Sequence, residues 1–222
     1  MEIGKSFSKY YHTISWLILG LLLISFLGFN KTYFYHFPSF RGTSLVIHFH
    51  VISIFCWFLM LFSQAMLAKN GRIELHRKIG KLSYLLVPLI LVGFALVTNY
   101  GQLKQKAPDL LGASIFDGSL FVLFYALAII YKKNSDYHAK YMILSAVPFI
   151  NPGLGRFLSP AVSLPVEFLL ILILLMIAYI KKKPYRPFLV ALGSFLVLLT
   201  IIVYISIIQL SIIESLWTVI WG

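Results

Sequence analysis

Histidines and other polar side chains within long apolar stretches are the residues of this chain that could do chemistry. Such side chains are costly to place in a membrane, so each one is a candidate for function. They form two groups. The candidate cofactor ligands are His50, Gln64, His76, Arg77 and His138, and the candidate substrate or ion pathway is Asp117, Asn151, Arg156 and Glu167.

One regular series of side chains runs through the apolar block that contains His50. His50, Trp57 and Gln64 follow one another at intervals of seven residues. At 3.6 residues per helical turn, such positions stay within about 40° of one another. The series therefore predicts one inward-facing stripe with a histidine near one end and a glutamine near the other. His48 lies off this stripe, so the His48-x-His50 pair is a poor chelate on a regular helix.

His76 and His138 each stand at the start of an apolar block, and both blocks start on the same side of the membrane. A b-type haem takes axial ligands from its protein, and helical bundles commonly supply them from facing helices. We predict one inner haem site with these two histidines as axial ligands. Arg77 and Arg156 would neutralise the haem propionates or an anionic substrate, and His50 would serve as an outer ligand or proton relay.

The same residues allow three other interpretations. A transition-metal ion could use the imidazoles of His50, His76 and His138. A small-solute or ion carrier could use the second group, because discontinuous helices often form substrate sites. A sensor or assembly protein would need the polar side chains only to hold helices together, for example in a structural ion pair of Arg156 with Asp117 or Glu167.

The spacing of these residues resembles a known family. The segments are His50-x13-Gln64, Arg72-x3-His76-Arg77-x2-Gly80, and His138-x3-Met142 followed by Arg156. They resemble the DUF2306-like bacterial membrane proteins over Leu45–Leu158. That family usually has Trp where Tyr141 stands and Arg where Ala139 stands. The resemblance implies a membrane topology and candidate residues but no reaction. A weaker likeness is to the cytochrome b561 and ferric-reductase group, which implies haem-based redox chemistry.

The elements that carry these residues are long apolar segments. The chain has 222 residues, of which 60% are hydrophobic and 12% are charged, whereas soluble proteins carry about 25% charged residues. A membrane-spanning helix needs about 20 apolar residues. We therefore predict a single all-α domain over residues 1–222, a polytopic transmembrane helical bundle of about seven spans. The predicted spans are Thr13–Phe29, Thr43–Ala68, Ile79–Tyr100, Ser114–Tyr131, Tyr141–Leu158, Val162–Ile180 and Phe188–Leu210.

The positive charges predict how this bundle is oriented. Of the 19 Lys and Arg residues, fourteen fall on the side of the N-terminus and five on the other. Cytoplasmic loops carry the excess of positive charge, so we predict the N-terminus inside and the C-terminus outside. The net charge of +12 then reflects topology, not nucleic-acid binding. The predicted location is the cell membrane, specifically a bacterial inner membrane. The predicted partners are the lipid bilayer and either a redox partner or a small-molecule substrate.

Two segments depart from a regular span. The predicted fifth span contains Pro148, Asn151-Pro152, Gly153 and Gly155, and proline removes a backbone hydrogen bond from a helix. We expect this segment to kink or unwind against its neighbours. The tail Ser211–Gly222 carries Trp217 and Trp221, which are typical anchors at the headgroup level.

Overall fold

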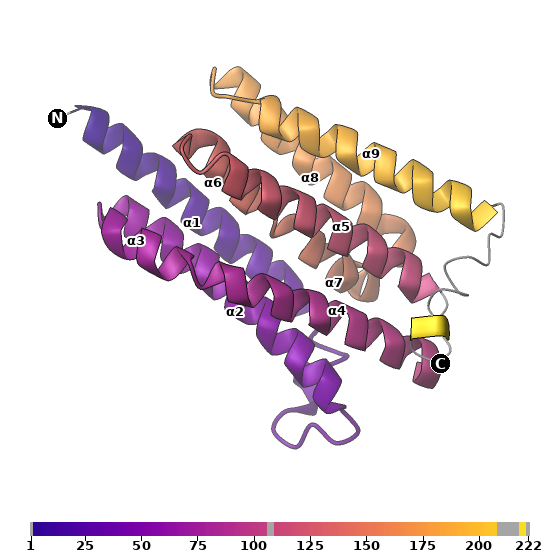
Figure 1. Ribbon diagram of the computed structural model, residues 1–222. Coiled ribbons are helices and arrows are strands. Elements are labelled where there is room, and N and C mark those ends of the chain that lie inside the picture. The colour runs from indigo at the N-terminus through magenta and orange to yellow at the C-terminus, as the bar shows by residue number, and fades with distance from the viewer. Residues whose placement is uncertain (1, 106–108, 208–217, 221–222) are drawn as a thin grey trace.

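All regular structure is helical in the part of the chain that the computed structural model describes, residues 2–105, 109–207 and 218–220. The long helices lie side by side as one bundle (Figure 1). This confirms the predicted all-α class for these ranges. Most of the tail predicted to lie at the interface falls outside them. The helices are α1 (Glu2–Gly28), η1 (Phe34–His36), α2 (Leu45–Lys69), α3 (Ile73–Gly80), α4 (Ser83–Gln105), α5 (Asp109–Ile130), α6 (Ser135–Leu144), η2 (Val147–Phe149), α7 (Ile150–Phe157), α8 (Pro160–Ile180) and α9 (Arg186–Ile207).

In the part of the chain that the structure describes, five helical stretches are long and apolar enough to cross a membrane. They are Leu45–Lys69, Ile73–Tyr100, Leu111–Ile130, Ala161–Ile180 and Arg186–Ile205, and the apolar part of α1, Thr13–Gly28, is shorter. The architecture is therefore that of a multi-pass integral membrane protein. The count of seven spans and the orientation remain predictions.

The outer surface of the bundle is apolar. Large hydrophobic side chains are exposed on α1, α2, α4, α8 and α9, among them Leu27, Ile52, Leu85, Leu169 and Val197. A soluble monomer rarely exposes apolar patches of this extent. Lipid tails are as apolar as these side chains, so this surface suits a bilayer.

The predicted fifth span is interrupted, as expected from its prolines and glycines. Helix α6 ends at Leu144, a 3₁₀ turn covers Val147–Phe149, and α7 follows with Asn151-Pro152 in its first turn. This interrupted segment is buried along most of residues 139–154. It packs against α1, α5 and α8. Irregular backbone at membrane depth is tolerated only where protein covers it, which explains its central place.

The third predicted span differs from the sequence expectation at its start. Instead of one helix from Ile79, the chain forms the short α3, ends it at Gly80 and begins α4 at Ser83. Gly71 has φ +70° just before α3, a conformation that glycine adopts readily. The turn between α2 and α3 brings α3 back alongside the end of α2, and the two helices pack together.

Candidate functional site

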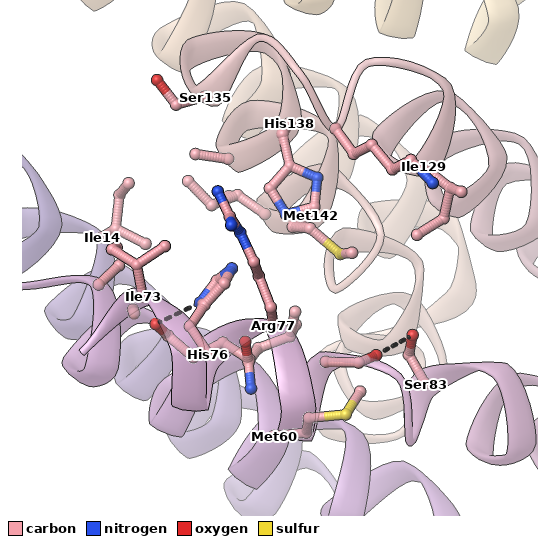
Figure 2. A pocket seen from close by; sticks show the side chains of 18 of the residues that line it. Ile14, Met60, Ile73, His76, Arg77, Ser83, Ile129, Ser135, His138 and Met142 are labelled. Atoms are coloured by element: carbon pink, nitrogen blue, oxygen red, sulfur yellow. Dashed lines mark hydrogen bonds between the residues drawn. The ribbon is translucent and has the colours of Figure 1, made fainter. Parts of the chain in front are cut away.

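A cavity of about 720 Å³ opens at the end of the bundle where α2 and α5 end and α3 and α6 begin. We call this end the basic end, because Lys69, Arg72, Arg77, Lys78, Lys81, Lys132 and Lys133 lie there in the loops and short helices. The cavity volume falls within the roughly 300–1,000 Å³ typical of small-molecule sites. Its lining includes His76, Arg77, His138 and Met142 (Figure 2).

Each of the two cavity histidines is held by a backbone carbonyl. The Nδ1 atom of His76 lies 3.2 Å from the carbonyl oxygen of Gln64. The Nδ1 atom of His138 lies 2.8 Å from the carbonyl oxygen of Ala128. A carbonyl can only accept, so Nδ1 is the donor in both rings. A neutral imidazole then keeps its lone pair on Nε2, the arrangement that metal-binding histidines show.

The two imidazole rings lie close together across the cavity. Their centroids are 6.3 Å apart, and their planes are inclined by 77°. Two imidazoles that bind one metal ion from opposite sides, with nitrogens about 2 Å from it, have centroids roughly 6 Å apart. Figure 2 shows the two rings on facing sides of the cavity. The predicted meeting of His76 and His138 at one level is thus found in the structure.

The cavity is apolar on one side and positively charged on another. Ile14, Ile18 and Ile73 supply apolar wall, and its cationic lining residues are Arg77, Lys81, Lys132 and Lys133. Within the described residues, none of these four cations forms an ion pair. The site therefore suits an amphipathic anion.

His138 lies before the predicted span 141–158, close to the basic end. Burial lowers the pKa of His138, its hydrogen bond to Ala128 opposes this, and His76 nearby lowers the pKa further. Burial and His76 thus favour the neutral imidazole of His138, the form that can act as a ligand.

His50 lies apart from this pair. It borders a separate small space of about 60 Å³ with Phe94, Phe149 and Pro152. His50 and Gln64 are fourteen residues apart on α2, which corresponds to about 21 Å along a helix. Among the described residues, no three His, Cys, Asp or Glu side chains gather closely enough to hold a metal ion. The structure therefore does not assemble the three-histidine metal site.

The predicted stripe on α2 does face inward. His50 Nδ1, Trp57 Nε1 and Gln64 Nε2 are all buried, and within the described ranges none of them has a hydrogen-bond partner. The side chain of Gln64 borders the cavity and lies beside Gly80, where an added Cβ would come within 3.5 Å of its Oε1 atom. The glutamine thus belongs to the site of His76, which its carbonyl also holds.

The second predicted group is only partly brought together. Asn151 Nδ2 donates to Asp117 Oδ1 over 3.0 Å, and Glu167 is buried near Asp117. Arg156 turns away from both carboxyl groups. Its guanidinium donates to the carbonyl of Pro152 over 2.9 Å and lies 4.8 Å from the ring centre of Phe29. The expected structural ion pair of Arg156 with Asp117 or Glu167 is therefore not formed.

Sequence reasoning missed two features beside the cavity. Lys140, counted among the topology-setting cations, is buried, with its Nζ 3.8 Å from Asp136 Oδ1. The spacing of four residues between the two, typical of helical ion pairs, was the available signal. Ser83 lines the cavity, and its Oγ forms a hydrogen bond of 2.8 Å with the hydroxyl oxygen of Tyr125. No local pattern links these two residues, because they lie on different helices.

Comparison with known proteins identifies no relative. No family model matches the chain, and neither a curated protein nor a solved structure matches it. The likenesses to the DUF2306-like proteins and to the cytochrome b561 group therefore remain predictions from the motifs. What stands is a multi-pass helical membrane protein with a histidine-lined cavity at its basic end.

Proposed function

We propose that this chain is a membrane redox protein that binds one b-type haem through His76 and His138. The observation that supports the proposal best is the pair of imidazoles 6.3 Å apart, each with its Nδ1 held by a carbonyl. Both rings therefore have Nε2 available, at a separation that suits one metal ion between them.

The rest of the cavity favours haem over a bare metal ion. A haem presents a broad apolar ring with two carboxylates, and the cavity combines an isoleucine wall with four cations. Haem iron held by protein ligands supplies one-electron chemistry when bound. In this assignment Arg77 binds a propionate by charge-assisted hydrogen bonds. The apolar side chains exclude water from the ring.

The placement in the membrane is part of the same proposal. With seven passes and the basic end in the cytoplasm, the haem would lie near the inner face of a bacterial inner membrane. There it could receive an electron from a cytoplasmic donor or a small reduced substrate. The clustering of Lys and Arg at this end supports that orientation.

An absorbance spectrum of the detergent-purified protein, oxidised and dithionite-reduced, tests this function. The wild type is expected to show a Soret band that shifts on reduction. His76→Ala and His138→Ala should each lose it, because one axial ligand is removed. His36→Ala, which changes an exposed histidine in a 3₁₀ turn, is the matched control and should keep the band.

Rescue separates loss of a ligand from loss of the fold. Imidazole added to His138→Ala during haem reconstitution should restore the reduced spectrum, since the small molecule can replace the missing ring. A wild type that remains colourless after reconstitution with haem would refute the proposal. The Soret band together with elemental analysis of the same sample distinguishes haem iron from a bare metal ion between the two histidines.

A further inference from the structure

A pair of carboxyl groups is buried in the bundle, away from the histidine cavity. Asp117 belongs to α5 and is 1% exposed, and Glu167 belongs to α8 and is 0% exposed. Neither residue lines the cavity of His76 and His138. Both lie about two turns into helices whose first residues are at the end opposite the basic end.

The two carboxyl groups differ in their hydrogen bonds. Asp117 Oδ1 accepts a hydrogen bond of 3.0 Å from Asn151 Nδ2. Both oxygens of Glu167 are buried and have no hydrogen-bond partner among the residues that the structure describes. A buried polar group without a partner is rare in native structures and calls for an explanation such as a bound ion or proton. The unpartnered carboxyl group of Glu167 therefore points to a bound ion or proton, in addition to the proximity of the two acids.

No cation among the described residues neutralises this pair. Helix α5 packs on α4, α6 and α9, and helix α8 packs on α7 and α9. Over residues 111–130 and 161–180, α5 and α8 carry no basic residue. On α7 the guanidinium of Arg156 is bound to Pro152 and Phe29. On α9 the only cation of the described range, Arg186, stands at the first residue.

We propose that Asp117 and Glu167 form a binding site for one exchangeable proton, carried by Glu167. Two ionised carboxylates that are buried side by side repel each other, and both lose their hydration. Ca²⁺ would require six to eight oxygen ligands, and the described residues offer no group of three His, Cys, Asp or Glu side chains here. A proton on one carboxyl removes the repulsion without further ligands.

The hydrogen bonds decide which carboxyl carries the proton. The N–H of Asn151 stabilises the ionised form of Asp117, while Glu167 has nothing to stabilise a charge. Asn151 is placed there by the interruption between α6 and α7, so the irregular backbone and the proton site belong together. This inference does not rest on the haem proposal, because the two sites share no residue.

Infrared spectroscopy of the purified full-length protein tests the proton site. At neutral pH the wild type should show the carbonyl stretch of a protonated carboxylic acid, and the band should shift in D₂O because the proton exchanges. Glu167→Gln should abolish the band. Asp117→Asn should shift the band, because it changes the side chain beside the protonated Glu167. Glu74→Gln, which changes an exposed acid on α3, should leave it unchanged.

A second measurement needs no variant. A hydrophobic carbodiimide reacts with protonated carboxyl groups in apolar surroundings, so mass spectrometry of the treated wild type should find the adduct on Glu167 and none on Glu74. An acid band that persists in Glu167→Gln, or a wild type with neither band nor adduct, would overturn the proposal. Loss of the haem spectrum alone would leave this result unchanged.

Discussion

At the scale of single residues, His138 combines a structural and a ligand role. Ala128 lies in the last turn of α5, where carbonyls have no partner within the helix, and the Nδ1 of His138 caps this carbonyl. A histidine that served only to cap the helix would need no interaction beyond this hydrogen bond. Its Nε2 remains available for a ligand, however, so capping orients the ring instead of competing with binding.

Arg77 provides a residue-scale test of the charged part of the cavity. Arg77→Gln should weaken haem retention by roughly 10- to 150-fold, because a charge-assisted hydrogen bond is worth about 1.5–3 kcal/mol. The measurement is the haem occupancy of purified protein after competition with apomyoglobin. Arg72→Gln is the matched control, since Arg72 is exposed and does not line the cavity. Equal retention by the two variants would contradict the assigned role of Arg77.

At the scale of elements, the interrupted segment depends on close packing by α1. A Cβ on Gly28 of α1 would collide with the backbone of Gly153 in α7. Ser25 lies one turn earlier on α1, and its Oγ bonds the carbonyl of Phe149 over 3.4 Å. Small residues let helices approach closely in membranes. The glycines therefore hold the segment that supplies Asn151.

Gly28→Ala should destabilise this packing. The added methyl overpacks a contact with rigid backbone, for which about 1–3 kcal/mol is typical, so the melting temperature in detergent should fall by several degrees, on the order of 2–4 °C per kcal/mol. Gly20→Ala is the control on the same helix, because its Cβ would meet nothing within 4 Å. Replacing a helical glycine there should raise stability slightly. A Gly28→Ala protein that melts like Gly20→Ala would refute the close contact.

At the scale of the whole molecule, the two candidate sites lie toward opposite ends of the bundle. The histidine cavity opens at the basic end, while Asp117, Asn151 and Glu167 lie nearer the ends where α5 and α8 begin. Both ends of such a bundle face water when it crosses a membrane. Orientation therefore determines from which compartment each site is reached.

Cysteine labelling checks the predicted orientation. In a Cys56→Ser background, Arg41→Cys should react with a membrane-impermeant maleimide added to intact cells, whereas Lys181→Cys should react only after the cells are opened. Both positions are exposed and lie between helices. The expectation follows from the excess of Lys and Arg on the side of Lys181. The reverse pattern of labelling would invert the topology and place the histidine cavity outside.

The sequence by itself determined the helical class, most helix boundaries and the interruption near Pro148. These features depend on local chemistry: apolar runs suited to lipid, and proline without its N–H. It also placed His76 and His138 at one end, because helices that alternate in direction bring alternate loops to the same side. The exception is the start of the third predicted span, where α3 follows a turn at Gly71 and ends at Gly80, and α4 begins only at Ser83.

Only the tertiary structure decided which polar residues meet. It set the two imidazoles 6.3 Å apart, joined Asn151 to Asp117 and turned Arg156 toward Phe29. It also left His50 in a separate space. Such contacts arise where side chains of different helices fit together in three dimensions, and the interrupted segment loses the helical periodicity that would relate its residues. Local spacing therefore could not determine them.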